Sequence, residues 1–318
     1  MNKRTRFSEF LEYYMKCSEL RVDKTTFAGY KSIVKIHLMP AFGNMRIGSI
    51  DSFTVQNFVF QLTDKGLSSK SIKNILSLLR AVMSKAVKMS LINNNPCQCV
   101  DLPSSSHRET DCYNLYEVTQ LIKSLSALSD SELKYKVAIE LALLCGWRKS
   151  EICGLDWECV DLVNKTARVK KKRVLVPGQG LIEGKPKTPN SYRVSVLPSV
   201  LYDDLVILQL RSEKTSPGSP VISSGEGAPI YPQVLARWFY RFLIKNNLRV
   251  ISLHKLRHTY ASMLASLNVD IKQVSECLGH AQTSTTLDIY VHLFQNKNYE
   301  IADKLTELLY KNDDIKEK

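Results

Sequence analysis

The first hundred residues show the hydrophobic periodicity of α-helices. Apolar residues recur at three- and four-residue steps over residues 6–20 and 52–63, which places them on one face of a helix. Between these segments, Thr25 or Thr26 is the predicted N-cap of a further helix, because its hydroxyl can accept a hydrogen bond from the first turn. The Pro and Gly of L-M-P-A-F-G, residues 38–43, are predicted to end that helix.

A longer helix is predicted to open with G-L-S-S-K-S-I at residues 66–72 and to end at N-N-N-P, residues 93–96. One face of this helix is apolar and predicts a buried stripe. The stripe consists of Ile72, Ile75, Leu76, Leu79, Val82, Met83 and Ala86. A polar segment at residues 101–110 follows, and we interpret it as a linker between two domains, residues 1–106 and 107–318.

The second part of the chain mixes helices with a few short strands. Helical periodicity returns from Leu115 and over residues 136–144 and 234–246. The segments V-D-L-V-N-K-T-A-R-V-K-K-K-R-V-L-V and Y-R-V-S-V-L-P predict strands of one small antiparallel sheet. Its Lys170–Arg173 run is typical of a solvated strand edge, with contact to a nucleic-acid backbone as the alternative. A last amphipathic helix is predicted at about residues 297–311.

Composition and charge narrow the functional classes. With 44% hydrophobic residues and no apolar run long enough to cross a bilayer, the 318-residue chain is predicted to be soluble, without a membrane partner. The N-terminus has no apolar signal segment and the eight Cys lack zinc-ligand spacing, so we predict a cytoplasmic protein with reduced thiols and no metal. The net charge of +13 favours a polyanionic partner such as nucleic acid.

Residues suited to chemistry concentrate between Ser252 and Tyr290. Ser252 is the predicted N-cap of a helix on which His254 and Arg257 lie three residues apart, so that both point at one spot beside the apolar face. That face comprises Leu256, Tyr260, Met263, Leu264 and Leu267. Taken alone, the His–Arg pair is more often a surface Arg beside a half-buried His. The L-G-H motif that ends at His280, followed ten residues later by Tyr290, changes that balance.

A further motif lies upstream, in C-G-W-R-K-S-E-I-C-G-L. Arg148 begins a new segment there, and Glu151 is spaced to lie on the same face and orient it. Taken together and in their order along the chain, the motifs resemble those of the tyrosine recombinase (phage integrase) family. They are this G-x-R-x-x-E motif, the later K-T-x-x-S-x-R, H-x-x-R and L-G-H motifs, and the final Tyr. The resemblance covers nearly the whole chain.

The resemblance implies both the fold and the reaction. The expected fold class is mainly α, with a SAM-like core-binding helical bundle over residues 1–106. An α+β catalytic domain of the DNA breaking–rejoining type, with its small antiparallel sheet, is expected over residues 107–318. The implied activity is site-specific recombination, in which a Tyr attacks a DNA phosphate, forms a 3′-phosphotyrosyl link and releases a 5′ hydroxyl. Because the bond energy is kept in that link, no cofactor is expected.

The resemblance also assigns roles to individual side chains. Arg148 and Arg257 would grip the non-bridging phosphate oxygens, since a planar guanidinium makes two parallel hydrogen bonds to such a group and removes the need for a metal. His280 would donate to a non-bridging oxygen. His254 would take the proton of the nucleophile, Tyr290, because imidazole titrates near neutral pH.

The leaving 5′ hydroxyl needs a proton, which in the family comes from a Lys on a hairpin. Lys187 fits the K-T-x-x-S-x-R pattern and is assigned this role, with Lys185 as the alternative.

The partners that the resemblance implies are double-stranded DNA, three further copies of the chain and accessory DNA-bending or directionality factors. Four protomers would act on two paired sites through a Holliday junction, to integrate or excise a phage or mobile element. The helix at residues 297–311 would dock on a neighbouring protomer or on its own domain. Because many integrases carry an extra N-terminal arm-binding domain, a start of the helices almost at Met1 implies either a simple site or a shortened N-terminus.

Three alternatives accompany this interpretation. Tyr290 could be a core aromatic between Ile289 and Val291, the commoner fate of an isolated Tyr. A type IB topoisomerase shares the Tyr chemistry, although the two-domain layout favours recombination. A DNA-binding regulator with a vestigial site would bind DNA without cutting it, and the presence of all six expected residues argues against this.

Overall fold

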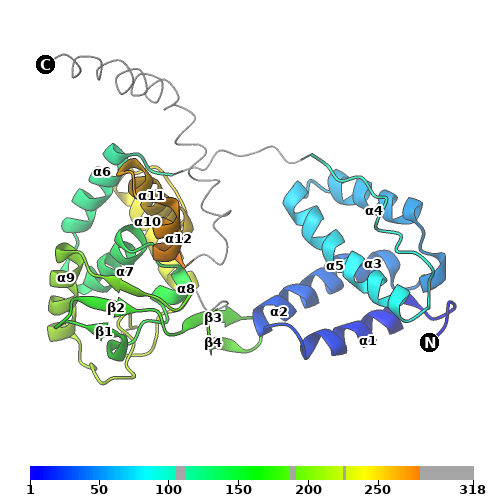
Figure 1. The fold of residues 1–318 in the computed structure, drawn as a ribbon, viewed down its shortest axis with the longest axis horizontal. Helices are drawn as coiled ribbons and strands as arrows, with labels where there is room; N and C mark the ends of the chain where they lie inside the picture. The colour runs from blue at the N-terminus through cyan, green and yellow to red at the C-terminus, as the bar shows by residue number, and fades with distance from the viewer. Residues whose placement is uncertain (105–111, 187–190, 225–226, 280–318) are drawn as a thin grey trace, which may run out of the picture. The chain divides into compact units, whose positions relative to one another are not determined.

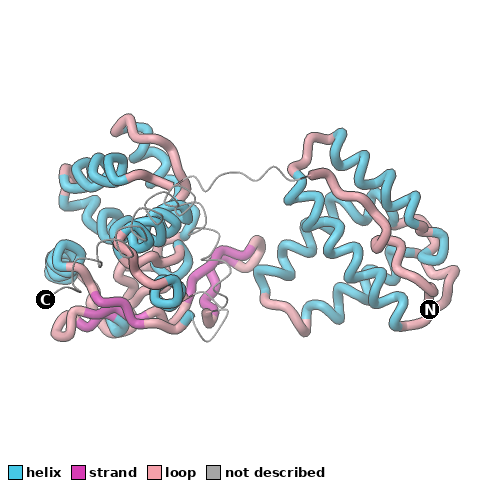
Figure 2. The backbone as a smooth tube through the Cα atoms, turned by 45° about the horizontal axis from the view of Figure 1, so that its top comes forward, coloured by secondary structure: helices cyan, strands magenta, loops and turns pink. Residues whose placement is uncertain are grey.

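The computed structural model describes residues 1–104, 112–186, 191–224 and 227–279, which form two compact units (Figure 1). Helices account for most of both units and strands for only a few short segments (Figure 2). The predicted fold class, mainly helical with a small antiparallel sheet, is confirmed. Most of the predicted linker lies outside the described residues, so the domain boundary stays a prediction. The predicted helix at residues 297–311 lies wholly outside them. No helix in the described ranges is long and apolar enough to cross a membrane.

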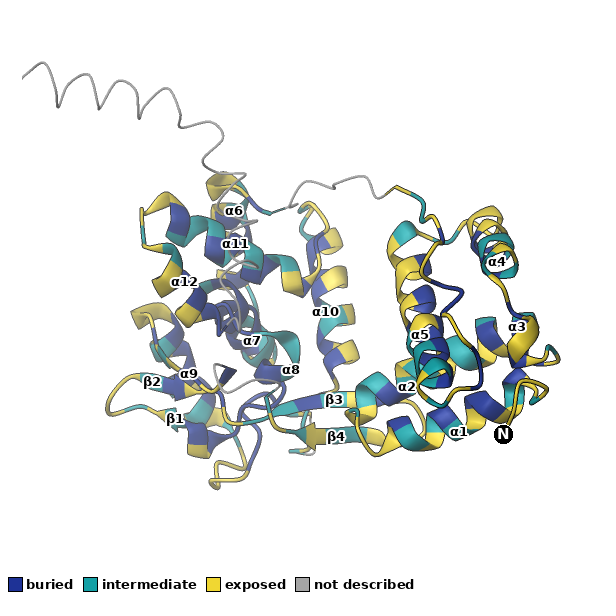
Figure 3. Ribbon diagram, turned by 45° about the vertical axis from the view of Figure 1, so that its right-hand side comes forward, coloured by how far each residue is buried: buried dark blue, intermediate teal, exposed yellow. Residues whose placement is uncertain are grey.

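The first unit is a bundle of helices around a continuous apolar core. Its elements are α1 (Phe7–Glu19), α2 (Lys24–Ile33), the π-helical turn η1 (Val34–Leu38), α3 (Met39–Phe42), the 3-10 turn η2 (Ile47–Ser49), α4 (Ser52–Asp64) and α5 (Ser69–Lys88). Every residue of the predicted α5 stripe is buried, and Leu78 joins it. Figure 3 shows this stripe as the buried side of a helix whose opposite side is exposed.

One helix boundary in the first unit differs from the prediction, and another follows it. Asp23, and neither Thr25 nor Thr26, caps α2, because its carboxylate accepts a hydrogen bond from the Thr26 backbone N–H. The helical stretch ends at Phe42 with Gly43 as its C-cap, inside the predicted segment, and it runs through Pro40. A proline lacks an N–H and crowds the carbonyl four residues earlier. The π-helical turn immediately before it, with its wider hydrogen-bond spacing, allows the chain to remain helical at this point.

The second unit is built around a helix whose residues 137–143 are all buried. This is α7 (Leu133–Leu144), which packs against α9 and α11. The other helical elements are α6 (Leu115–Ser126), η3 (Asp130–Glu132), α8 (Lys149–Ile152), η4 (Trp157–Cys159), α9 (Ser199–Arg211), α10 (Pro232–Lys245), α11 (Leu253–Ser266) and α12 (Ile271–Leu278). The predicted helices over 136–144 and 234–246 are therefore confirmed.

The strands form two sheets, where the sequence predicted one. The strands β1 (Val160–Asp161), β2 (Thr166–Arg168) and β5 (Val194–Val196) form an antiparallel sheet in the order β1-β2-β5. The strands β3 (Lys172–Val176) and β4 (Gly180–Gly184) pair separately. In the first sheet Ala167 lies opposite Ser195, so the side chain of Ser195 lies on the same face of the sheet as the buried side chain of Ala167.

The basic run at residues 170–173 is largely paired, which corrects the prediction of a solvated edge. Arg173 is buried and donates to the carboxylate of Asp156, which is wholly buried, and to that of Glu183. Lys171 pairs with the same two carboxylates. These contacts fasten the β3–β4 pair to the body of the unit, because Asp156 belongs to the segment that precedes β1.

A buried carboxyl pair between α7 and α9 predicts how stability depends on pH. Burial, and then the neighbouring Asp204 carboxylate, raise the pKa of Glu140. The folded state therefore holds a proton that the unfolded state releases above the ordinary Glu pKa of about 4.3. Its contribution to stability is present at low pH and is lost as pH rises through the raised value.

We expect Glu140→Gln to become more stable relative to wild type between pH 5 and pH 8.5. The difference should exceed about 1 kcal/mol, the equivalent of one pKa unit, which shifts the unfolding midpoint by roughly 2–4 °C in a unit of this size. Thermal unfolding at the two pH values measures this. Glu213→Gln, at an exposed position, is the control and should show no such trend. A pH-independent difference for Glu140→Gln would contradict the assignment.

Candidate active site

The segment that links α7 to α8 places Arg148. Gly146 adopts φ +63°, and a Cβ at this position would lie 2.5 Å from the ring of Tyr260 and 2.9 Å from the side chain of Leu278. Only glycine fits both the left-handed backbone and this close approach. Trp147 is then buried, with its Nε1 donating to Ser195 Oγ at 2.9 Å, and Arg148 follows as the N-cap of α8.

The side chain of Glu151 orients Arg148, as the spacing of the two residues predicted. Glu151 Oε1 accepts from Arg148 Nη1 at 2.7 Å, and Oε2 accepts from the Arg148 backbone N–H at 2.9 Å. Burial by itself would raise the pKa of Glu151, but the charges and hydrogen bonds of Arg193 and Arg148 outweigh it and hold the pKa below its usual range. Glu151 is therefore an ionised, buried carboxylate in contact with two guanidinium groups.

Arg193 is the site residue that the sequence reasoning missed. It precedes β5, is 8% exposed, and donates from Nη2 to Glu151 Oε2 at 2.9 Å. The K-T-x-x-S-x-R pattern contains it, but that pattern served only to choose between two lysines. An Arg next to a short strand gives no indication by itself that its side chain points inward.

Arg257 lies inside the unit, which corrects its predicted position beside the apolar face. It is 2% exposed, and its Nη1 and Nη2 donate to the carbonyl oxygens of Gly146 and Leu278, each at 2.5 Å. The buried face of α11 also differs from the prediction, because Leu267 is exposed and follows the helix as its C-cap. The buried residues are Leu253, Leu256, Arg257, Thr259, Ala261 and Ala265. Burial first, and then the charge of Arg148, lower the pKa of Arg257.

Arg148 and Arg257 meet at the C-terminal end of α12. Arg257 bonds the Leu278 carbonyl, and Arg148 Nη2 donates at 3.4 Å to the next carbonyl, that of Gly279. These oxygens carry the partial negative charge of a helix C-terminus, which attracts cations. Gly279 has φ +62° and ends the helix, and His280 is the next residue along the chain.

His254 lies on the first turn of α11, beside the two arginines. Burial first, and then the charges of Arg257 and Arg148, lower its pKa, so its imidazole is neutral at pH 7 and can accept a proton. Its ring meets the ring of His258 edge-on, with centroids 4.8 Å apart. Burial, and then His254, lower the pKa of His258 to about 4.

A cavity of about 710 Å³ opens between the N-terminal ends of α8 and α11 and the side of α10. Its lining combines cationic and aromatic side chains with backbone at the start of a helix. The lining residues are Arg148, Lys149, Ser150, Ala236, Phe239, Tyr240, Val250, Ile251, Ser252, Leu253, His254 and Lys255. Two of the predicted site residues, Arg148 and His254, therefore face one cavity.

Three of the six predicted site residues lie outside the described residues, namely Lys187, His280 and Tyr290. The alternative lysine, Lys185, is exposed and follows β4 directly. Nothing in the described geometry chooses between Lys187 and Lys185. Within the same ranges, no cluster of three or more His, Cys, Asp or Glu side chains is arranged to hold a metal ion.

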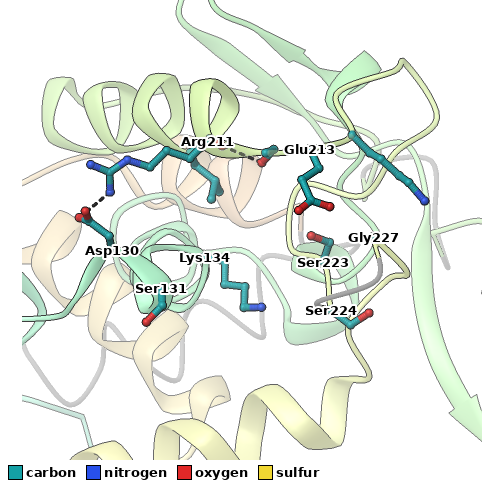
Figure 4. A pocket seen from close by; sticks show the side chains of 11 residues that line it. Asp130, Ser131, Lys134, Arg211, Glu213, Ser223, Ser224 and Gly227 are labelled. Atoms are coloured by element: carbon teal, nitrogen blue, oxygen red, sulfur yellow. Dashed lines mark hydrogen bonds and ion pairs between the residues drawn. The ribbon is translucent and has the colours of Figure 1, made fainter.

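A second pocket, of about 230 Å³, lies between the start of α7, the end of α9 and the loop before α10 (Figure 4). Its charges are mixed, because Asp130 and Glu213 stand among Lys134, Arg211 and Lys214. Figure 4 shows Arg211 directed at Asp130, with which it pairs. This pocket shares no lining residue with the cavity at Arg148 and lacks that site's excess of cations.

The chain matches family models over both units. Residues 114–297 match the model of the phage integrase family, and residues 6–62 match that of the phage integrase N-terminal SAM-like domain. The chain is 27% identical to the ICEBs1 integrase of Bacillus subtilis, over 95% of this chain and 83% of that protein.

Solved structures show the same fold. The Tn1549 transposon integrase in complex with a circular intermediate DNA has a TM-score of 0.80 at 20% identity, covering 89% of this chain and 94% of that chain. A lambda integrase tetramer bound to a Holliday junction has a TM-score of 0.67 at 18% identity, covering 89% of this chain and 77% of that chain.

The close approach at Gly146 predicts a large loss of stability on substitution. In Gly146→Ala the left-handed backbone costs about 1–2 kcal/mol, and contact of the new Cβ with Tyr260 and Leu278 adds about 1–3 kcal/mol. Gly180→Ala is the matched control, because Gly180 has φ +73° but open space around its Cβ position. Denaturant unfolding should show a clearly larger loss for Gly146→Ala. Equal losses would mean that the packing against Tyr260 is not tight.

Proposed function

The chain belongs to the phage integrase family and is a site-specific DNA recombinase of the tyrosine type, and we propose that Arg148, Arg257 and His254 are its phosphate-binding and proton-accepting groups. In this proposal Tyr290 is the nucleophile. Lys187 protonates the leaving group, with Lys185 as the alternative, and His280 donates to a non-bridging oxygen.

The observation that carries the proposal is the charge balance of the site. Arg148 and Arg193 contact the carboxylate of Glu151, and the charge of Arg257 acts on it without contact, which leaves two positive charges in excess among these four side chains. Lys149 and Lys255 at the cavity wall add to this excess. Preorganised cations of this kind stabilise an anion, and most strongly the charge that develops on a phosphate in the transition state.

The proposed step conserves phosphodiester bond energy. The Tyr290 oxygen bonds to phosphorus as the bond to the 5′ oxygen breaks, and the phenol proton passes to the neutral imidazole of His254. The 5′ oxygen leaves as a hydroxyl after protonation by Lys187. A 5′ hydroxyl of the partner duplex then attacks the phosphotyrosyl link and reverses each transfer. A phenol with an ordinary pKa near 10 needs such a base at neutral pH.

We further propose that four copies of the chain act on two double-stranded DNA sites. The lambda integrase tetramer on a Holliday junction supports this arrangement through its shared fold. The element would be a phage or another mobile element, with DNA-bending or directionality factors as further partners. The net charge of +13 predicts that DNA binding weakens steeply with salt, because each neutralised phosphate releases a counterion.

A nicked suicide substrate tests the nucleophile. It carries the recombination site, and the short strand beyond the cleavage point diffuses away after cutting, so that the covalent intermediate accumulates. We expect a protein–DNA adduct on a denaturing gel for wild type and none for Tyr290→Phe. Sequence-specific binding without an adduct would support the regulator. Relaxation of supercoiled plasmid at no specific site would support the topoisomerase.

Replacement of Arg257 by Lys tests the phosphate clamp. A single ammonium cannot bond both carbonyls and still present a planar pair of donors to phosphate. We expect the rate of adduct formation to fall by about 10²–10³-fold, the range for loss of one oxyanion donor. Arg211→Lys, at an exposed Arg that pairs with Asp130 and contacts neither the Gly146 nor the Leu278 carbonyl, is the control and should retain the wild-type rate. A loss of less than about threefold for a folded Arg257→Lys would exclude Arg257 from the clamp.

A further inference from the structure

We infer that Arg193 is a positioning residue of the recombination reaction, which holds Glu151 in place so that Glu151 can hold Arg148 toward the phosphate. This inference rests on the proposed function of Arg148. Arg193 itself does not line the cavity. Its Nε and Nη1 atoms are buried, and its Nη2 atom makes a buried hydrogen bond to Glu151.

The contacts form a chain from the sheet to the cavity. Arg193 Nη2 binds Glu151 Oε2 at 2.9 Å, and Glu151 Oε1 binds Arg148 Nη1 at 2.7 Å. The Arg193 guanidinium lies over the ring of Trp147, 5.8 Å from its centroid. Trp147 in turn bonds Ser195, which lies two residues after Arg193, in β5. The position of β5 is thereby transmitted to the side chain of Arg148.

The energetics of Arg193 point to function rather than stability. Its Nε and Nη1 atoms have no hydrogen-bond partner among the described residues, although both are buried. Burying unpaired donors of a charged group costs stability, and apolar replacements of buried ion pairs are often neutral or stabilising. A guanidinium at this position is explained by what its charge does for Glu151, its direct partner.

Three cations from three elements act on the Glu151 carboxylate. They are Arg148 at α8, Arg193 before β5 and Arg257 on α11. Burial is the largest single influence on the pKa of Glu151 and raises it, and Arg193 makes the largest opposing contribution. Without Arg193, we therefore expect the balance to move toward burial and the pKa of Glu151 to rise. A protonated Glu151 would lose its charge-assisted hold on Arg148.

The first experiment compares adduct formation by Arg193→Met and Arg193→Lys at pH 6.5 and pH 8.5, each relative to wild type. We expect Arg193→Met to be at least about tenfold slower than wild type at pH 6.5 and to recover toward the wild-type rate at pH 8.5, because a carboxyl with a raised pKa loses its proton as pH rises. Arg193→Lys keeps a cation beside Glu151 and should show a flat ratio. A uniform loss by Arg193→Met at both pH values would overturn the inference.

The double variant Arg193→Met/Glu151→Gln identifies the titrating group. The ratio of its rate of adduct formation to the wild-type rate should be the same at both pH values, because the titrating carboxyl of Glu151 has been removed. Persistence of the pH dependence would assign it to another group and also overturn the inference. If Arg193→Met does not fold, Arg193→Gln, which keeps more of the polar contacts, takes its place in the same comparison.

Stability provides a readout that does not depend on activity. In Arg193→Met we expect the pKa of Glu151 in the folded state to be raised, so the stability that its bound proton contributes is lost as pH rises. The amount by which the unfolding midpoint of Arg193→Met lies below that of wild type should therefore grow between pH 6.5 and pH 8.5. Activity and stability would then change in opposite directions with pH. Arg173→Met is the matched control, because Arg173 is equally buried but pairs with Asp156 and Glu183. The loss in unfolding midpoint of Arg173→Met should either not vary with pH or keep its variation when Glu151→Gln is added.

The two proposals can fail separately. If wild type forms no adduct, the proposed recombination chemistry fails, while the stability comparison still tests the link from Arg193 to Glu151. If wild type forms the adduct and the stability deficit of Arg193→Met does not change with pH, only the role of Arg193 fails.

Discussion

The catalytic unit depends on one electrostatic constraint: a buried carboxylate has to remain ionised. Glu151 is 4% exposed, and its charge is stabilised by guanidinium groups from two separate elements. The same contacts align those elements, because a carboxylate that accepts on both oxygens restrains both of its partners. The cluster remains cationic after this pairing, which suits it to the phosphate that we propose as its ligand.

A second set of contacts brings distant segments to the same place. Arg257 joins the carbonyl of Gly146, at the end of the α7 segment, to that of Leu278, at the end of α12. Gly146 in turn allows Tyr260 and Leu278 to pack closely against the backbone that leads to Arg148. The site is thus assembled at the ends of three helices, where backbone carbonyls are available and small residues permit close approach.

Electrostatics also govern the strands. Lys171 and Arg173, which the sequence alone assigns to a solvated edge, pair with Asp156 and Glu183 and hold the β3–β4 pair to the unit. The strand pair precedes the segment that contains both candidate lysines, so its attachment limits where that segment can begin. Buried ion pairs of this type contribute more to geometry than to net stability.

The sequence by itself determined the helices, the buried stripe of α5 and the pairing of Arg148 with Glu151, because hydrophobic periodicity and short spacings are local properties of the chain. Its motifs also indicated the family. Only the tertiary structure decided that Arg257 is buried, that Arg193 joins Glu151 and that the strands form two sheets. These features depend on contacts between residues that are far apart in the sequence. Arg257, for example, bonds Leu278, 21 residues away, and Gly146, 111 residues away. Periodicity carries no information about such contacts, because it reports which face of an element is buried but not what that face meets.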